Sequence, residues 1–179
     1  NAMAGYAFAR IPFKGRGAVF SVMLMSMMVP GTVMLIPNYI IINKLGMYDT
    51  LFALIFPYVM SVYNIFLMRQ QFYAVSKELE EAAELDGAGI FRTFIVIAMP
   101  LVTPMLVVLG ITTFMWNYNN FLWPLVATQS SEVFTLARSL GSLVSAGSNN
   151  VNLYPVMLAG AVIVSLPMIV VFFLLQKYI

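Results

Sequence analysis

Residues 76–89 read S-K-E-L-E-E-A-A-E-L-D-G-A-G and carry five of the seven acidic side chains in the chain. Ser76 suits an N-cap, and Glu78 falls in the first turn, where the helix dipole favours negative charge. Gly87 stands where a left-handed C-cap needs a glycine. The residues that share one face at helical spacing are Phe72, Val75, Leu79, Ala82 and Ala83. The pattern predicts a short, exposed amphipathic helix that ends in a tight turn and is followed by a second short piece.

The rest of the chain is too apolar for a water-soluble domain. Of its 179 residues, 61% are hydrophobic and only 9% are charged, whereas soluble domains carry about a quarter charged residues. We therefore expect an all-α integral membrane protein. Histidine and cysteine are absent from the sequence, which removes His-based proton transfer, Cys nucleophiles and the usual zinc ligands. No phosphate-binding loop motif and no basic tract is present, so we expect no metal, no cofactor and no nucleic-acid partner.

Intervals without charge mark the expected membrane segments, each of which needs about 20 residues. They are residues 17–43 with Pro30 and Pro37, residues 50–68 with Pro57, residues 93–131 and residues 139–176. The last two are long enough for one helix each, at about 94–115 and 155–176, plus an interfacial or re-entrant piece. Residues 1–9 are too short to span and suggest the tail of a longer helix. We expect a single domain over residues 1–179, truncated at both ends, with about four complete spans.

The lysines and arginines orient these spans. Four crossings place seven basic residues on one side and two on the other, and the positive-inside rule makes the richer side cytoplasmic. The seven are Arg10, Lys14, Arg16, Arg69, Lys77, Arg92 and Lys177, against Lys44 and Arg138. Residues 76–93 are therefore expected to form a cytoplasmic loop, and residues 126–154 to lie outside.

The acidic loop has two interpretations. Its alanines would let another backbone approach closely, and its acids would pair with basic groups of a partner. Alternatively, it is a solvated loop whose charges only confer solubility. Glu81-Ala82-Ala83, Gly87, Ile97 and Pro100 fit the spacing E-A-A-x3-G-x9-I-x-L-P, with Met99 in place of leucine.

This pattern resembles the EAA motif of ABC importer permeases. The resemblance implies the transmembrane domain of a type I importer, with six helices at full length, in which this loop is the coupling helix that sits in a cleft of the ATPase subunit. The residues expected to form or position this ATPase contact are Glu78, Glu81, Ala82, Ala83, Asp86, Gly87 and Pro100.

Other segments resemble the carbohydrate branch of that family, in particular the second permease subunit of maltose-type transporters. Residues 6–10 read Y-A-F-A-R, and residues 116–125 read W-N-Y-N-N-F-L-W-P-L, similar to the family pattern W-x-x-N-[DE]-F-x-W-P-L. Asn120 stands where the family often has an acid, which puts any charge-dependent role there in doubt. The resemblance implies a second permease subunit, two ATPase subunits, an extracytoplasmic solute-binding protein and a bacterial or archaeal plasma membrane.

The 116–125 segment also has more than one interpretation. Its tryptophans suit interfacial anchors. Its amides need hydrogen-bond partners, which a sugar or a neighbouring helix would supply. We assign this segment to the translocation path or a subunit interface, with Trp116, Asn117, Asn119, Asn120 and Trp123. Residues 145–152 are small and polar and suggest an external loop. By resemblance this loop would reach the binding protein through Gly147, Asn149 and Asn150.

The leading hypothesis is a permease subunit of an ATP-driven importer of a sugar or polyol, without enzymatic activity of its own. An ABC permease for amino acids, peptides or other small solutes would share the same loop. A channel or secondary carrier is disfavoured, because no charged residue lies inside a span to bind a coupling ion. An intramembrane enzyme would lack His, Cys and buried carboxylates.

Overall fold

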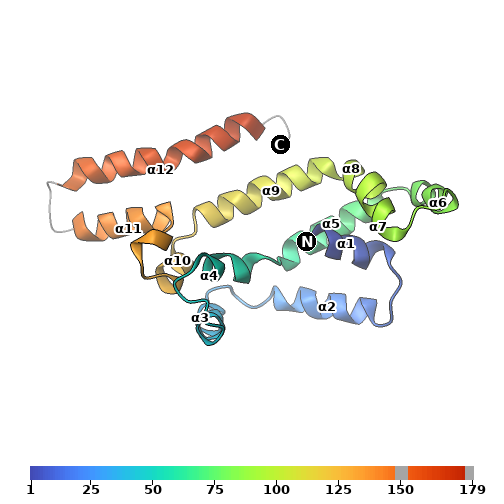
Figure 1. The fold of residues 1–179 in the computed structure, drawn as a ribbon, viewed down its shortest axis with the longest axis horizontal. Helices are drawn as coiled ribbons and strands as arrows, with labels where there is room; N and C mark the ends of the chain where they lie inside the picture. Colours follow the sequence, from blue (N-terminus) through green and yellow to red (C-terminus); the bar gives the residue numbers. More distant parts are fainter. Residues whose placement is uncertain (148–152, 176–179) are drawn as a thin grey trace. The chain divides into compact units, whose positions relative to one another are not determined.

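The computed structural model describes residues 1–147 and 153–175 (Figure 1). The chain divides into two compact units. Unit 1 comprises residues 1–31 and 59–109, and unit 2 comprises residues 32–58 and 110–179. The described residues form helices, turns and connecting segments without strands. The expected all-α class is confirmed.

Unit 1 holds the helices on either side of the acidic stretch. They are α1 (Ala2–Arg10), α2 (Arg16–Ser26), α5 (Val62–Ala74), α6 (Lys77–Leu85), α7 (Ile90–Thr93), a π-helix (Phe94–Ala98), α8 (Met99–Leu101) and the first part of α9 (Thr103–Tyr118). Helix α1 packs along α5, and Tyr6 lies 5.2 Å from Phe72 and 5.0 Å from Phe94 between ring centroids. These rings belong to a core that also takes in Ala98 and Val102. A second cluster, on another face of α1, joins Phe8 to Phe20 and Ile65.

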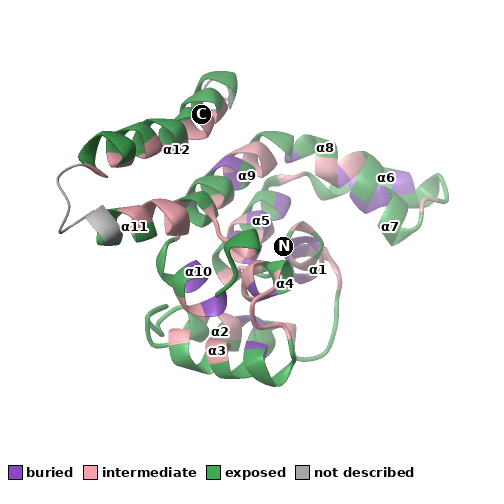
Figure 2. Ribbon diagram, turned by 60° about the vertical axis from the view of Figure 1, so that its left-hand side comes forward, coloured by how far each residue is buried: buried purple, intermediate pink, exposed green. Residues whose placement is uncertain are grey.

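Unit 2 holds the remaining helices. They are α3 (Leu35–Lys44), α4 (Leu51–Ile55), a 3-10 turn (Phe56–Tyr58), the second part of α9, α10 (Leu122–Ala127), a 3-10 turn (Ser131–Val133), α11 (Leu136–Gly147) and α12 (Tyr154–Leu175). Its core cluster joins Ile42, Ala53, Trp123 and Ala127. Helix α11 packs along α12, and most of the described α12 side chains are exposed (Figure 2).

The expected helix at residues 94–115 is not continuous. Residues 94–98 form a π-helix, and the segment Ile90–Leu101 meets Thr103–Tyr118 at an angle of 79°. Pro104 lacks the N–H that would bond to the Pro100 carbonyl, so the helical ladder is interrupted there. Val102 takes φ −101° and ψ 9° at this break. The expected helix is thus found from Thr103 to Tyr118, and residues 94–101 belong to the bent segment before it.

The first expected span is likewise two pieces. Helix α2 ends at Ser26, and α3 begins only at Leu35, so the interruption at Pro30 is real. Pro37, by contrast, lies in the first turn of α3, where the missing N–H costs no helical bond. Helix α2 belongs to unit 1 and helix α3 to unit 2.

Within the described residues, one helix is long and apolar enough to cross a membrane unaided. It is Tyr154–Leu174, with a mean hydropathy of 2.7. Two helix pairs meet the same condition only if each counts as one bent span, namely Leu51–Tyr58 with Val62–Ala74 and Ile90–Leu101 with Thr103–Tyr118. The helix expected near residues 155–176 is thus found from Tyr154 to Leu175, with Pro167 inside it.

Candidate functional site

The acidic stretch forms helix α6, with the ends that local sequence predicts. The Ser76 hydroxyl accepts a hydrogen bond from the Glu78 N–H at 3.2 Å. At the other end Gly87 takes φ +80°, and the N–H groups of Gly87 and Ala88 donate to the carbonyls of Glu84 and Ala83 at 3.0 and 2.9 Å. These two bonds are those of a Schellman motif, which needs the left-handed conformation that glycine adopts without strain. The expected N-cap and C-cap are confirmed.

The faces of α6 differ from the prediction. Among the residues expected to contact an ATPase, those exposed on α6 and in the turn after it are Glu78, Glu81, Ala82, Asp86 and Gly87. Ala83 is buried, and Leu79 is exposed. The chain is extended at Val75 and Ser76, between α5 and α6, so Phe72 and Leu79 do not belong to one continuous helical face. Pro100 is exposed in α8, beyond the π-helix.

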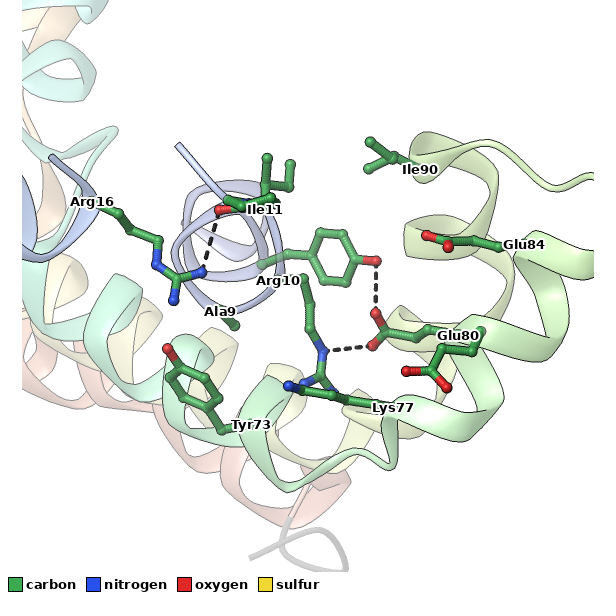
Figure 3. A pocket seen from close by; sticks show the side chains of 12 residues that line it. Ala9, Arg10, Ile11, Arg16, Tyr73, Lys77, Glu80, Glu84 and Ile90 are labelled. Atoms are coloured by element: carbon green, nitrogen blue, oxygen red, sulfur yellow. Dashed lines mark hydrogen bonds and ion pairs between the residues drawn. The ribbon is translucent and has the colours of Figure 1, made fainter. Parts of the chain in front are cut away.

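Glu80 is the acid that faces the protein. Its Oε1 lies 2.8 Å from Nε of Arg10, and its Oε2 accepts a hydrogen bond from the Tyr6 hydroxyl at 3.1 Å (Figure 3). The exposed fractions of the Arg10 and Glu80 side chains are only 7% and 11%. Glu80 is not among the residues expected from the sequence to form a site. Its spacing of three from Ala83 places both on one helical face, which is the signal that was available.

An open cavity of about 330 Å³ lies beside this ion pair. Its lining comes from the end of α1, the connector to α2, and helices α5, α6 and α7, with charged groups of both signs. Figure 3 shows Arg16 closing the connector by donating to the Ile11 carbonyl, at 3.3 Å. The cavity therefore lies where the end of α1 and its connector meet helices α5, α6 and α7.

Within residues 116–125, the side chains of Asn120 and Trp123 have their hydrogen-bond partners inside unit 2. Trp123 is buried, and its indole N–H donates to the Ala53 carbonyl at 3.0 Å. Asn120 donates to the Tyr58 hydroxyl at 3.1 Å and accepts from the Trp123 N–H at 3.3 Å. These two side chains hold α10 against α4. Because Trp123 is buried within the protein, it does not serve as an anchor at the membrane–water interface.

The other three residues of this assignment, Trp116, Asn117 and Asn119, are exposed. Asn117 and Asn119 donate to the carbonyls of Thr113 and Met115, one turn earlier in α9. Trp116 has 74% of its surface exposed. Their amide oxygens and the indole face remain at the surface of the described structure, and the translocation-path or interface assignment of all five residues stays a prediction.

A second polar cluster lies in the connecting segments of unit 2. The Asp49 carboxylate accepts from the N–H groups of Gln129 and Ser130, at 2.7 and 2.9 Å, and from the Ser130 hydroxyl. These donors, led by the Gln129 N–H, hold the pKa of Asp49 below its usual range. Arg138 donates to the carbonyls of Pro124 and Thr128 and to the Thr128 hydroxyl. Hydrogen bonds to Asp49 and from Arg138 therefore fix both ends of the segment 128–138.

The expected external loop is partly helical. Helix α11 continues to Gly147, so residues 145–147 are helical, against the prediction of a loop there. Asn149 and Asn150 lie outside the described residues. No cluster of three or more His, Cys, Asp or Glu side chains arranged to hold a metal ion occurs among the residues that the structure places.

The comparison with known families defines the class of protein. A family model described as binding-protein-dependent transport system inner membrane component matches residues 1–179, and the chain belongs to this family. It is a family of transport permeases of the inner membrane, which confirms the resemblance found in the sequence.

Individual relatives are more specific. The chain is 35% identical over 178 residues to the arabinooligosaccharides transport system permease protein AraQ of Halalkalibacterium halodurans, covering 99% of this chain and 63% of the relative. It is 33% identical over 177 residues to the lactose transport system permease protein LacG of Rhizobium radiobacter, covering 99% and 64%. The chain thus spans just under two thirds of the length of these relatives.

A solved structure has the same fold. The crystal structure of a bacterial ABC transporter involved in the import of the acidic polysaccharide alginate matches with a TM-score of 0.85 and 25% sequence identity, over 99% of this chain and 66% of that one. The fold of this chain is therefore that of an ABC importer permease.

Proposed function

We propose that this chain is a permease subunit of an ATP-driven importer of a sugar or polyol. The support for the cargo is the set of relatives, whose names specify arabinooligosaccharides and lactose, together with the alginate importer. Cargo specificity in such a system would rest largely on the binding protein and the partner permease.

The proposed assembly contains a second, similar permease subunit, two ATPase subunits and an extracytoplasmic solute-binding protein, in the plasma membrane of a bacterium or archaeon. This chain crosses the membrane several times, and ATP is hydrolysed on the separate ATPase subunits. No phosphate-binding loop motif occurs in this sequence, which agrees with that division of labour.

The observation that carries the proposal is the geometry of α6. It presents Glu81 and Ala82 of the motif on a short helix whose ends are both capped, with Gly87 in the turn that follows. The exposed acids Glu78, Glu81 and Asp86 would pair with basic groups of the ATPase, and Gly87 would turn the chain sharply beside the contact. Closure of the ATPase dimer would then move α6 and switch the spans between inward-open and outward-open states.

The experiment separates the turn from its surroundings. A Cβ at Gly87 would meet nothing within 4 Å, so Gly87→Ala strains only the backbone, at a cost of about 1–2 kcal/mol. Gly89→Ala is the matched control, because Gly89 is equally open and has φ −74°. The measurements are ATP-dependent uptake of an arabinooligosaccharide, lactose and a maltodextrin by the full-length complex, and the ATPase activity stimulated by binding protein and solute.

We expect Gly87→Ala to lower uptake and stimulated ATPase activity together, while Gly89→Ala retains both. Equal activity of the two variants in a correctly inserted complex would contradict the coupling role of this turn. Uptake of an amino acid or a peptide but of none of the three carbohydrates would assign the subunit to another branch of the same importers.

A further inference from the structure

Arg10 contacts three parts of unit 1 at once. Its Nε lies 2.8 Å from Glu80 on α6, and its Nη2 donates to the Val75 carbonyl at 2.5 Å, in the joint between α5 and α6. Arg10 itself is the last residue of α1. One guanidinium therefore links the end of α1, the joint and the inner face of α6.

The joint needs such a link. Val75 and Ser76 are both extended, with ψ of 135° and 132°, and they alone connect the two helices in sequence. Rotation about those few bonds would let α6 pivot relative to α5. Because the guanidinium is planar and its donors are fixed in a fork, its contacts with the joint and with α6 fix the direction in which α6 leaves the joint.

Tyr6 completes the attachment of α6 to α1. Its hydroxyl donates to the second oxygen of Glu80, so both carboxylate oxygens are held by residues one turn apart on α1 (Figure 3). The Tyr6 ring also packs against Phe72 and Phe94, on α5 and in the π-helix. The carboxylate is therefore fixed in position and direction.

Helix α1 is in turn fixed to α5. A Cβ on Gly5 would lie 2.6 Å from the Met68 Cβ, which shows how closely the backbones approach. Further along, Arg69 donates to the Phe8 carbonyl at 3.3 Å and stacks over Phe20 of α2 at 4.0 Å. A displacement of α6 that reaches Arg10 thus reaches α1 and α5 together.

Stability alone is a weak reason for this arrangement. A buried ion pair contributes little net stability compared with apolar residues of the same shape, because both charges lose their hydration. What it supplies is a defined geometry. Resting on the proposed function of α6 as the ATPase contact, we propose that Arg10 is a positioning residue that makes α6 and α1 move as one rigid body during transport.

The first test removes the link and then replaces it. These 179 residues contain no cysteine, so Arg10→Cys/Glu80→Cys can be labelled selectively in a full-length complex from which any cysteine elsewhere has been removed. We expect the unlabelled variant to lose about 2- to 30-fold of the ATPase stimulation by binding protein and solute, the range that single positions contribute to coupling between sites. A bifunctional methanethiosulfonate that bridges the two cysteines should restore the stimulation, and a monofunctional reagent should not.

Other outcomes decide against the proposal. If bridging arrests a complex that is active without it, α6 must move relative to α1, and the rigid-body role is wrong. Tyr6→Phe is the milder second variant, which removes one hydroxyl and should give a smaller loss. Lys14→Met is the matched charge control, because Lys14 is exposed in the connector after α1, and it should behave like the unmodified protein.

The proposed function and this inference fail in different ways. If the unmodified complex shows no ATP-dependent uptake, or Gly87→Ala has no effect on it, the ATPase contact itself is misassigned. If uptake and the Gly87 effect are present but Arg10→Met retains full stimulation, only the positioning role of Arg10 is refuted.

Discussion

Gly5 of α1 faces Met68 of α5 with so little space that an added Cβ would lie 2.6 Å from the Met68 Cβ and 3.0 Å from the Arg69 nitrogen. Since one of these neighbours is backbone, the helices must separate to accept any side chain. This contact fixes the distance between the two helices that form the centre of unit 1.

Gly5→Ala should therefore destabilise the folded subunit. Overpacking of this kind costs about 1–3 kcal/mol, and the measurement is the thermal unfolding midpoint of the purified complex. Gly17→Ala provides the control, because a Cβ there meets nothing within 4 Å. Equal midpoints for the two variants would show that α1 and α5 do not pack as described.

Substitution by phenylalanine should reduce stability much more at Trp123 than at Trp116. Trp123→Phe removes the indole N–H that bonds to the buried Ala53 carbonyl, and an unsatisfied buried acceptor costs about 1–3 kcal/mol. Trp116→Phe changes a side chain that is 74% exposed and should leave stability within about 0.5 kcal/mol. Chemical denaturation of the detergent-solubilised protein compares them, and a larger loss for Trp116→Phe would contradict the burial of Trp123.

Replacement by valine should change stability in opposite directions at two buried threonines. Thr93 and Thr128 are each 2% exposed, but the Thr93 hydroxyl has no hydrogen-bond partner among the described residues, whereas that of Thr128 donates to Pro124 at 2.8 Å. Thr93→Val should stabilise the protein by about 1 kcal/mol, and Thr128→Val should destabilise it by about 1–3 kcal/mol. Destabilisation by both changes would mean that the Thr93 hydroxyl is paired in the assembled transporter.

Asp49 should give the connecting segments of unit 2 a dependence on acid. Hydrogen bonds from Gln129 and Ser130 lower its pKa in the folded state, so the folded state favours the carboxylate. The resulting stabilisation is present above the unfolded-state pKa of about 3.9 and is lost as the pH falls through the lower folded-state pKa.

Asp49→Asn tests this without altering the backbone. Asp49 has φ +58°, a conformation that asparagine also tolerates, and the amide oxygen can still accept the two N–H groups. Unfolding midpoints measured from pH 7 down to pH 3 should fall less steeply in this variant than in the unmodified protein. Glu132→Gln, which removes another charge from the same segment, should keep the original slope. Parallel curves for all three proteins would show that the Asp49 carboxylate does not stabilise these segments.

Local signals in the sequence were enough to place α6. The Ser76 cap and the Gly87 turn depend on residues within one or two turns of each other, so their spacing could be read directly. Family membership followed from the same stretch. The cytoplasmic position of this loop and the expected external contacts at Asn149 and Asn150 remain predictions.

Interactions between distant residues could not be predicted in this way. Arg10 and Glu80 are separated by 70 positions, and nothing in the pattern around either one names the other. Trp123 was expected near an interface, but its partner Ala53 is likewise 70 positions away. The break at Val102 lies between Pro100 and Pro104, which are local features of the sequence, but the expected helix at residues 94–115 placed no break there.

The capped ends of α6 also affect how a partner would bind to this helix. Its first turn is capped by Ser76, and its last carbonyls are engaged by Gly87 and Ala88, so the helix is formed before any contact is made. A segment that is already ordered loses little conformational entropy on association. The free energy released at such a contact would then remain available as mechanical work on the transmembrane helices.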